Sequence, residues 1–524
     1  MPSTFLSRMQ LWDAAVSIGM FALVTVFACV CFKMLVRWIR IYMCLRNVPQ
    51  PKERFPFSLI LDMWSMMSAM DPALDVPAKL FNYFHYMFQQ VVDQELTVAF
   101  YGPQPFLIAL TPNTAERVLS NSENLNKSFL YDMMKSWIGN GLLTSDKDIW
   151  KKRRKVLTPA FHFRVLEDYV PVMNRRASEL VKKLNSLSTG SFDLLPVMRI
   201  AAFGILFETA MGIQLDEKLK LLRTGFLQVN DEISSSIIAR MLNIYHWLGI
   251  TYGFSPEGRR FYKKVELIKE YTQKILRTRK ATYKVGVTEK DRNKSFMDIL
   301  LRMHMDEGIF TEDEIREEVN TFMIGGFDTT ATAAAFAVHL LGNHPEAQAK
   351  VHAEIDSVFG NDRERPVTTD DIRNLKYLEC VLKETLRLYP PIPVIARKID
   401  EDVVIGKHTI PKGTVSIVML YFLHRHPRFF EKPDVFLPER FLDCADRHPF
   451  LYIPFSGGAR NCIGQKFAQL EDKILLTHIM RHFKVESELP MEQLQMSLEL
   501  VLRPTQGLHL KVTPRIARAE KTNN

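Results

Sequence analysis

The sequence predicts a mainly α-helical protein with small β-sheets, placed behind an N-terminal transmembrane helix. Residues 14–32 form an uncharged apolar run, residues 169–284 follow a helical pattern, and residues 319–341 are almost wholly apolar or small. Only a short alternating stretch, residues 95–110, is typical of strands. With 47% hydrophobic and 24% charged residues, the chain has the composition of a globular protein with a large core.

The N-terminal run predicts an uncleaved membrane anchor. Ala14 to Phe32 would span roughly 28 Å as a helix, close to the hydrocarbon thickness of a bilayer. Only Arg8 precedes the run, whereas four basic residues follow it: Lys33, Arg37, Arg40 and Arg46. This bias predicts a lumenal N-terminus and a cytosolic remainder. A cleaved signal peptide is disfavoured, because the basic residues lie on the wrong side and no small-x-small cleavage site follows.

Three regions are predicted along the chain: 1–47 as the anchor with its basic flank, 48–56 as a proline-rich hinge, and 57–524 as the globular body. Pro49, Pro51 and Pro56 are too closely spaced for a helix to continue through the hinge. The six cysteines show no C-x-x-C spacing, which favours a reducing compartment. No nucleic-acid motif accompanies the net charge of +9, so no nucleic-acid partner is expected; anionic lipid headgroups and an acidic redox partner suit the basic faces better.

The body is predicted to begin with a β-hairpin that turns at Gly102-Pro103, followed by a helix capped by Thr111. Residues 237–254 are apolar enough to touch the membrane or to roof a pocket, and an amphipathic core helix is an equal alternative. Residues 319–341 are predicted to be a helix in the protein core rather than a second membrane span. Asp328 lies near their middle, and an ionised Asp is expensive at bilayer depth.

The stretch Phe455–Gly464 concentrates residues with chemical roles. The hypothesis is that Cys462 is a thiolate ligand of a haem iron, because a thiolate donates electron density and favours O–O cleavage. A helix starting at residue 465 would lower the pKa of the thiol. Gly458 and Gly464 would take backbone angles closed to other residues. Arg460 would pair with a haem propionate, and Phe455 would shield the sulfur.

These positions resemble the haem-binding loop F-x-x-G-x-R-x-C-x-G of the cytochromes P450. Trp150 and Arg154, four apart on one helical face, match the W-x-x-x-R of that family, whose side chains contact the haem propionates. Arg397 resembles another propionate ligand. The neighbouring basic residues are expected to face elsewhere and to help dock an acidic electron donor: Lys151, Lys152, Arg153 and Lys155.

Residues 325–330 resemble the oxygen-binding segment of the same family. Gly325 and Gly326 would let the helix lie against the haem and leave room for dioxygen. Thr329 would draw a hydroxyl or water into the groove. Asp328 would supply a proton as a general acid–base group. A further resemblance, to the E-x-x-R motif and its basic partner, assigns three residues to a buried structural network rather than to catalysis: Glu384, Arg387 and Arg440.

Because the resemblance covers essentially the whole chain, it implies one large domain with the P450 fold, with residues 57–524 as a haem-binding monooxygenase domain. It implies haem b and NADPH-derived electrons delivered by NADPH–cytochrome P450 reductase, with cytochrome b5 as a second donor. The expected location is the endoplasmic reticulum membrane. The expected reaction is hydroxylation or epoxidation of lipophilic substrates such as fatty acids, terpenoid or steroid-like lipids, or xenobiotics.

Residues 158–163 and 322–330 look like family 4, whose many fatty-acid hydroxylases often carry Glu-Gly-His-Asp-Thr-Thr and esterify that Glu to a haem methyl. Gly325 and Phe327 stand here instead, which implies a non-covalently held haem. Strict selectivity for a terminal methyl group, and the substrate itself, stay open. Two alternatives also stay open: a haem-thiolate isomerase or dehydratase that needs no reductase, which the Asp328-Thr329 pair disfavours, and a membrane-tethered binding protein without turnover.

Overall fold

A computed structural model describes residues 2–50, 58–214, 217–283, 295–443 and 447–515. Most of the predicted hinge, residues 51–56, lies outside the described residues. The longer helices are α1 (Pro2–Leu45), α2 (Ser58–Ala69), α3 (Val76–Val91), α4 (Pro112–Leu119), α7 (Lys147–Leu157), α9 (Val170–Leu187), α10 (Leu194–Met211), α11 (Glu217–Leu242), α13 (Pro256–Thr282), α14 (Phe296–Met305), α15 (Glu312–Asn343), α16 (Pro345–Phe359), α18 (Lys376–Leu388) and α20 (Gln465–His482).

The short helices are α5 (Phe129–Asp132), α6 (Lys135–Ile138), η1 (Thr158–Phe161), α8 (Phe163–Glu167), η2 (Ile244–His246), α12 (Gly249–Phe254), α17 (Thr369–Asn374), α19 (Leu420–Leu423), η3 (Pro438–Phe441) and η4 (Met491–Gln493). The strands are β1 (Leu96–Tyr101), β2 (Gln104–Ala109), β3 (Phe192–Asp193), β4 (Val394–Lys398), β5 (Val403–Ile405), β6 (His408–Ile410), β7 (Val415–Met419), β8 (Phe483–Ser487), β9 (Met496–Leu498), β10 (Leu502–Pro504) and β11 (His509–Pro514). The predicted class, mainly helical with small sheets, is confirmed.

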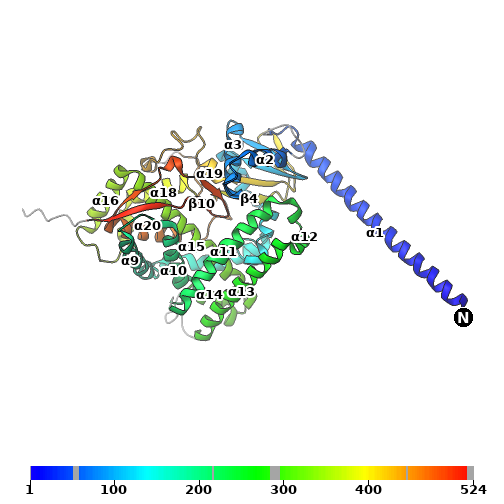
Figure 1. Cartoon of the computed structure of the whole chain (residues 1–524), viewed down its shortest axis with the longest axis horizontal. Helices are drawn as coiled ribbons and strands as arrows, with labels where there is room; N and C mark the ends of the chain where they lie inside the picture. The colour runs from blue at the N-terminus through cyan, green and yellow to red at the C-terminus, as the bar shows by residue number, and fades with distance from the viewer. Residues whose placement is uncertain (1, 51–57, 215–216, 284–294, 444–446, 516–524) are drawn as a thin grey trace, which may run out of the picture.

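Helix α15 runs through the middle of the body and packs against α10, α18 and α20 (Figure 1). A capping box between Thr311 and Glu314 starts it, and acidic residues fill its first turn. Val319, Phe336 and Leu341 are fully buried along its length. The prediction of a core helix over residues 319–341 is therefore confirmed.

The largest sheet has the strand order β1-β2-β7-β4, in which β2 and β7 are parallel and the other pairs antiparallel. The predicted hairpin is β1–β2, and its turn uses Gly102 at φ +62°, a conformation that favours glycine. Thr111 caps α4, also as predicted. Arg397 lies on the edge strand β4, so this sheet carries one of the predicted site residues.

Helix α1 extends away from the body (Figure 1), and its last turns contact β6 of the two-stranded β5–β6 sheet. Ile41 and Leu45 are buried in the core that covers this sheet, and Arg40 pairs with Asp402 over 3.0 Å. The stretch Val16–Leu45 is apolar and long enough to cross a membrane. Helix α10 is also apolar and long enough, but 72% of it is buried inside the protein, so it is a core helix.

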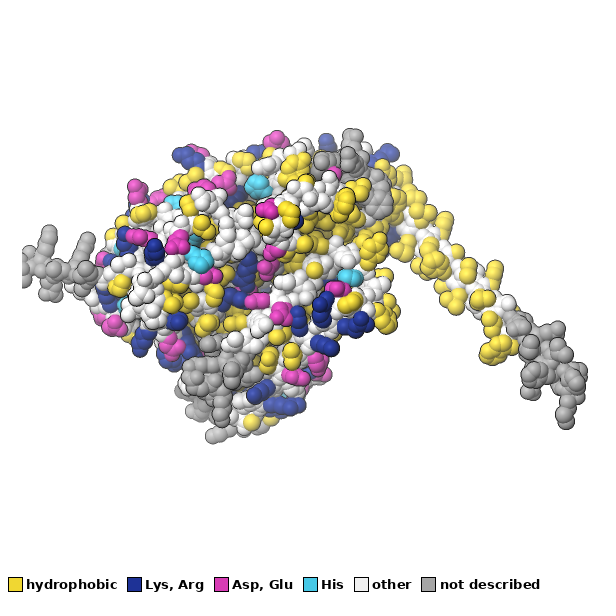
Figure 2. All heavy atoms as spheres, in the orientation of Figure 1, with side chains coloured by type: hydrophobic (Ala, Val, Ile, Leu, Met, Phe, Trp, Pro, Cys, Tyr) yellow, Lys and Arg dark blue, Asp and Glu magenta, His cyan; other side chains and the backbone are white. Residues whose placement is uncertain are grey.

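Apolar side chains continue from α1 onto the adjoining face of the body (Figure 2). The exposed large apolar residues of α2, η2, α12 and the turn between η2 and α12 are Leu61, Trp64, Tyr245, Leu248, Ile250 and Phe254. Of the alternatives for residues 237–254, a place in the wall of a pocket is confirmed, because Ile238 and Trp247 line an internal cavity. A single core helix is wrong, since the stretch is divided among the end of α11, η2 and α12. Contact with a membrane stays a prediction.

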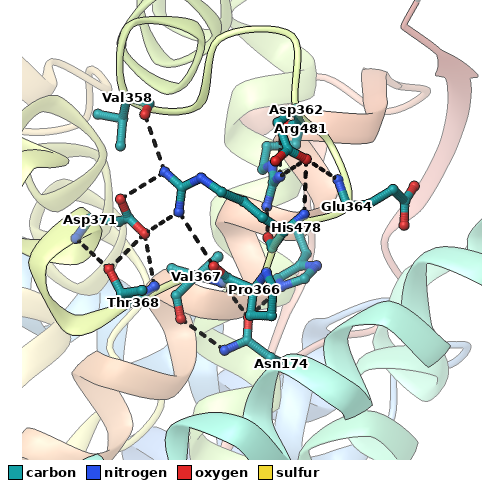
Figure 3. Close-up of polar contacts among 11 residues, drawn as sticks. Asn174, Val358, Asp362, Glu364, Pro366, Val367, Thr368, Asp371, His478 and Arg481 are labelled. Atoms are coloured by element: carbon teal, nitrogen blue, oxygen red, sulfur yellow. Dashed lines mark hydrogen bonds and ion pairs between the residues drawn. The ribbon is translucent and has the colours of Figure 1, made fainter.

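A network of polar contacts fixes the loop between α16 and α17 against α9 and α20 (Figure 3). The Asn174 amide bonds both the N–H and the carbonyl of Val367, over 2.7 and 2.9 Å, and His478 contacts the same amide. Arg365 binds Asp371 through two hydrogen bonds of 2.7 and 2.9 Å. A surface hollow of about 680 Å³ lies beside this network and contains none of the predicted site residues.

Candidate active site

An internal cavity of about 560 Å³ lies between α15 and the loop that contains Cys462. Its walls come from α7, α11, α15, β4 and the start of α20. Nine of the predicted site residues line it: Trp150, Arg154, Gly325, Gly326, Thr329, Phe455, Arg460, Cys462 and Gly464. Three others are not part of the lining: Asp328, Arg397 and Gly458. The fold therefore gathers motifs that are far apart in sequence around one space.

The Cys462 loop is held by the protein backbone. The Cys462 N–H donates to the Phe455 carbonyl over 2.9 Å, and the Asn461 N–H donates to the Gly458 carbonyl over 3.1 Å. Helix α20 begins at Gln465, as predicted. The sulfur is thus fixed just ahead of a helix N-terminus.

The two loop glycines differ from each other. Gly458 has φ +71°, and a Cβ there would collide with the Leu119 carbonyl at the end of α4. Gly464 has φ −84°, an angle open to any residue. The prediction of a restricted backbone angle is right for Gly458 and wrong for Gly464. At Gly458 the absence of a side chain lets the loop backbone lie against Leu119.

Burial raises the pKa of the Cys462 thiol, and the Gly464 N–H and the Arg154 guanidinium oppose this rise without reversing it. The prediction of a lowered pKa is therefore wrong for the polypeptide itself. The sulfur is accessible from the cavity. A coordinating metal ion deprotonates a thiol outright, so a thiolate here depends on the metal.

Three basic side chains beside the loop form no ion pair within the described residues: Lys127, Arg397 and Arg460. Arg460 is 7% exposed and donates from Nη2 to the Ser145 carbonyl over 2.6 Å, while its Nε and Nη1 have no partner. Arg397 is 1% exposed, and its Nη2 has no partner. Burial, and then the charge of Arg397, lower the pKa of Arg460 to about 9. Burial and the two guanidinium groups lower the pKa of Lys127 as well.

Buried cations without partners are unstable unless an anion joins them. Guanidinium groups match carboxylates particularly well, because they can donate two parallel hydrogen bonds. Haem carries two propionates and accepts a thiolate as axial ligand. Arg460 and the Cys462 sulfur line the same cavity, and Arg397 is buried beside Arg460; their unpartnered nitrogens and the sulfur fit this group.

Helix α7 presents its motif residues to the cavity. Arg154 donates to the carbonyl and the side-chain oxygen of Asn461, both over 2.8 Å, and so supports the Cys462 loop. The Arg460 guanidinium lies 4.6 Å from the centre of the Trp150 ring, within the range of a cation–π contact. Trp150 therefore contacts Arg460, the predicted propionate ligand, and Arg154 contacts the next residue, Asn461.

Arg153 on the same helix is buried and faces α15. It binds Glu317 over 2.9 Å and Glu318 over 2.8 Å. The prediction that Arg153 belongs to an exposed docking face is therefore wrong, because its charge is used inside the protein. The other three basic residues of this stretch are exposed: Lys151, Lys152 and Lys155.

The two glycines of α15 act in different ways. A Cβ on Gly325 would meet nothing within 4 Å, so the cavity is open there. A Cβ on Gly326 would lie 2.8 Å from both methyl groups of Leu206, so Gly326 lets α10 approach. The hydroxyl of Thr329 donates to the Gly325 carbonyl over 2.8 Å, and Thr330 does the same to Gly326 over 2.9 Å. Both hydroxyls therefore bond to the preceding turn of α15.

Asp328 is 5% exposed and pairs with two arginines. Its Oδ1 accepts from the Nε of Arg199 over 2.8 Å, and its Oδ2 accepts from Arg503. Burial alone would raise the pKa of Asp328, but the two guanidinium groups outweigh it and lower the pKa. The structure thus holds this predicted proton donor as a carboxylate directed at arginines.

The three residues predicted to be structural meet away from the cavity. Arg387 binds Glu384 through two hydrogen bonds of 2.8 Å, and Arg440 adds a third of 2.9 Å. Glu384 and Arg387 are fully buried. Arg387 also donates to the carbonyls of His424 and Pro433. Every charge in this cluster has a partner.

Comparison with known proteins agrees with this geometry. The family model described as "Cytochrome P450" matches residues 64–512. The chain belongs to the cytochrome P450 family. It is 36% identical to cytochrome P450 4V2 of Mus musculus over 97% of each chain, and 38% identical to cytochrome P450 4V2 of Homo sapiens over 82% of this chain and 86% of that one. It is also 38% identical to cytochrome P450 4c3 of Drosophila melanogaster, over 79% of this chain and 81% of that one.

The P450 assignment makes this chain a monooxygenase and implies haem b. Sequence reasoning had missed several ionisable residues that lie in or beside its site, and four of them are Lys127, Arg199, Glu499 and Arg503. Arg199 could have been found, because it and Glu208 are the only charged residues of the apolar stretch Leu194–Met211. The other three belong to no motif. They reach the site only through the tertiary fold.

Proposed function

We propose that this P450 is a membrane-anchored haem-thiolate monooxygenase that takes NADPH-derived electrons from a flavoprotein reductase and oxidises lipophilic substrates. The observation that carries the proposal is the shared cavity. Cys462, Arg460 and Lys127 line it together with Thr329 of α15, and Arg397 is buried beside Arg460.

Within that cavity the residues of the chain have distinct tasks. Cys462 would be the axial ligand, Arg397 and Arg460 would bind the propionates together with Lys127, and Trp150 and Arg154 would support them. When bound, haem supplies the chemistry that activates dioxygen. Thr329 would hold a water or hydroxyl near the open space at Gly325. Since Gly325 offers no carboxylate, the haem would be held without a covalent bond.

The remaining lining supports a lipophilic substrate. Leu242, Trp247, Leu500 and Val501 are among its apolar members. Glu499 interrupts this surface, and burial raises its pKa. Fatty acids, terpenoid or steroid-like lipids and xenobiotics all match an apolar space of this kind. An acidic side chain would favour a hydroxyl or amine over a carboxylate near position 499.

We place this P450 in the endoplasmic reticulum membrane, with a lumenal N-terminus and the catalytic domain on the cytosolic side. The basic residues that follow the apolar run of α1 support this orientation. The exposed apolar side chains of α2 and α12 lie on the side of the body from which α1 extends (Figures 1 and 2). A substrate dissolved in the membrane would therefore reach the roof of the cavity.

We propose that the exposed face of α7 docks the acidic NADPH–cytochrome P450 reductase, with cytochrome b5 as a second donor. Lys151, Lys152 and Lys155 form this face, and α7 also carries Trp150 and Arg154 to the cavity. Replacing the three lysines by glutamate should slow reduction at low salt more than at high salt, because salt screens exposed charges. Equal reduction rates at low salt would contradict the docking face.

The test of function uses the full-length P450 in lipid vesicles with reductase. Fatty acids, terpenoids and aromatic xenobiotics are screened for the spin-state shift of the haem, and each ligand that produces it is incubated with NADPH. The expected product carries one added oxygen atom and forms only when NADPH and reductase are both present. Conversion of a ligand without NADPH would support isomerase or dehydratase chemistry instead.

A further inference from the structure

The hairpin formed by β9 and β10 contributes its whole turn to the wall of the substrate cavity. The residues between the two strands are Glu499, Leu500 and Val501, and all of them line the cavity. Strand β9 packs against α3, which adds Leu80 and Phe84 to the same lining. The hairpin therefore places one carboxylate in an apolar part of the wall.

Glu499 has no cation of its own. It forms no ion pair with any residue that the structure describes, and the cation that acts on it is Arg503. The guanidinium group of Arg503, however, donates to Asp328 and, over 3.0 Å, to the hydroxyl of Thr332. The hydrogen bonds of Arg503 are thus made elsewhere, and the carboxylate of Glu499 stays available to a ligand.

The remaining charges around Glu499 are negative. They belong to Asp75 at the start of α3, Asp231 on α11 and Asp328 on α15. Arg199 binds both Asp231 and Asp328, so four carboxylates are matched by only two guanidinium groups in this part of the described chain, those of Arg199 and Arg503. Burial and the three other carboxylates raise the pKa of Glu499, and Arg503 opposes this rise.

This excess of negative charge distinguishes between the ligands that a lone carboxylate could bind. A hydroxyl group can donate a hydrogen bond to Glu499, but it leaves the excess charge in place. A ligand carboxylate adds to the excess and is repelled. An ammonium group compensates it, while the neighbouring side chains of Leu500, Val501, Leu80 and Phe84 can hold an apolar chain.

We propose that Glu499 is a specificity-determining residue that pairs with the ammonium group of a lipophilic amine. The cavity then prefers cationic amphiphiles to fatty acids of the same chain length. This inference rests on the proposed function, since it names the substrate class of the same cavity. The apolar chain of such a substrate would lie along the lining that also contains Thr329.

The test uses three probes that share one alkyl chain and differ in the charge of the head group: dodecyltrimethylammonium, 1-dodecanol and dodecanoate. The quaternary nitrogen has no lone pair and cannot coordinate the haem iron. Affinities are measured from the spin-state shift of the full-length, haem-loaded protein in phosphatidylcholine vesicles, whose lipid carries no net charge. Any preference among the probes then reports the charge of the cavity wall.

The wild type should bind the ammonium probe about tenfold more tightly than the alcohol, and dodecanoate most weakly. Glu499→Gln keeps the shape of the side chain and should lose this tenfold preference without a change in dodecanol affinity. Glu499→Lys should reverse the order and prefer dodecanoate. The matched control is Glu492→Gln, because Glu492 on η4 is exposed and does not line the cavity; it should match the wild type.

A wild type that binds dodecanoate as tightly as the ammonium probe would overturn the proposal. A preference for ammonium that survives in Glu499→Gln, or that is equally lost in Glu492→Gln, would also overturn it. An equal loss of dodecanol affinity in Glu499→Gln would show that the side chain shapes the wall rather than selects a charge, and would count against the proposal as well.

The pH dependence of binding gives a second readout. The quaternary ammonium is charged at every pH, so its affinity reports the ionisation of the protein. Because the pKa of Glu499 is raised, the affinity should fall in the wild type as the pH decreases through that raised pKa, and should fall less in Glu499→Gln. The same pH profile in both proteins would overturn the pairing. If the wild type oxidises no ligand with NADPH, the proposed function has failed, and the binding measurements alone decide the charge preference.

Discussion

Two kinds of buried charge stand side by side in this P450. In the Glu384 cluster every guanidinium and carboxylate is paired, and the Asp371 network around the α16–α17 loop is built the same way (Figure 3). Beside the Cys462 loop, by contrast, Arg397 and Arg460 form no ion pair with any residue that the structure describes, and each has a buried nitrogen without a partner there. Paired charge holds the chain together, whereas unpaired charge marks where an anionic group binds. The presence or absence of an ion-pair partner therefore distinguishes structural arginines from cofactor-binding ones, which the sequence alone does not distinguish.

The largest effect is expected from breaking a paired cluster. Arg387→Met leaves Glu384 charged and uncompensated, and should lower the free energy of unfolding by about 3–5 kcal/mol. The matched control is Arg373→Met, because Arg373 pairs with Asp370 at the same spacing but on the surface. That control should change stability by less than about 1 kcal/mol. Urea unfolding measures both, and similar losses in the two variants would contradict the distinction.

Replacing the unpaired arginines, Arg397 and Arg460, should weaken haem binding more than it lowers the stability of the fold. The double variant Arg397→Met/Arg460→Met should fold but release haem about 30-fold faster or more, since a lost buried charge pair costs about 2 kcal/mol or more. Transfer of haem to apomyoglobin measures the rate. Lys398→Met, an exposed neighbour of Arg397 on β4, serves as control and should release haem at the wild-type rate.

Haem dimethyl ester, which lacks both carboxylates, sharpens the same point. It should dissociate from the wild type far faster than haem does. In the double variant the two cofactors should dissociate at similar rates. An equal preference for haem in both proteins would show that these arginines do not bind propionates.

Variants at position 325 test whether the haem is held only by the propionate contacts and the Cys462 sulfur, without a covalent bond. Acidified organic solvent should remove the haem completely from the wild type. Gly325→Glu has room for the new side chain and should leave part of the haem on the polypeptide. Gly325→Gln has a similar shape but no carboxylate to form an ester, and should release all of it. Haem retained by the wild type would contradict non-covalent binding.

The smallest effect is expected at Asp371. Burial opposes its ionisation, but Arg365 and the Thr368 donors lower the pKa of Asp371 to about 2. A lowered pKa in the folded state stabilises the protein above the unfolded pKa near 4, and this contribution disappears as the pH falls towards 2. Asp371→Asn should therefore cost about 1–2 kcal/mol at pH 7 and almost nothing at pH 2.

The neighbour Asp370 provides the control for that measurement, because it is exposed and pairs only with exposed Arg373. Asp370→Asn should leave the free energy of unfolding nearly unchanged at every pH. A pH-independent loss in Asp371→Asn would mean that its carboxylate charge contributes nothing.

Much of this fold could be predicted because the decisive signals are local. The uncharged run of α1, the Gly102 turn and the Thr111 cap each depend on a few neighbouring residues. The Cys462 loop and the Gly325–Thr330 segment were equally readable, since each motif is contiguous. The backbone conformation of the loop was harder to predict. The φ angle of Gly464 is set by the fold of its loop, and of the two predicted glycines only Gly458 contacts another segment, at Leu119.

What sequence could not supply was the pairing of charges across the fold. Arg153 and Arg154 are adjacent, yet Arg153 forms ion pairs with two glutamates of α15, whereas Arg154 bonds to the Cys462 loop. Asp328 was read as a free acid, whereas Arg199 and Arg503 reach it from α10 and β10. Such contacts join residues more than a hundred positions apart, and no local pattern encodes them.

The central claim is that Cys462 is the thiolate ligand of a haem held by unpaired cations. The most direct test is the absorption spectrum of the reduced carbon monoxide complex, measured for the purified wild type and for Cys462→His. The wild type should show the red-shifted Soret band of a thiolate-ligated haem, and Cys462→His should bind haem but lose that shift. A wild-type complex without the shift, or a shift that survives in Cys462→His, would contradict the account.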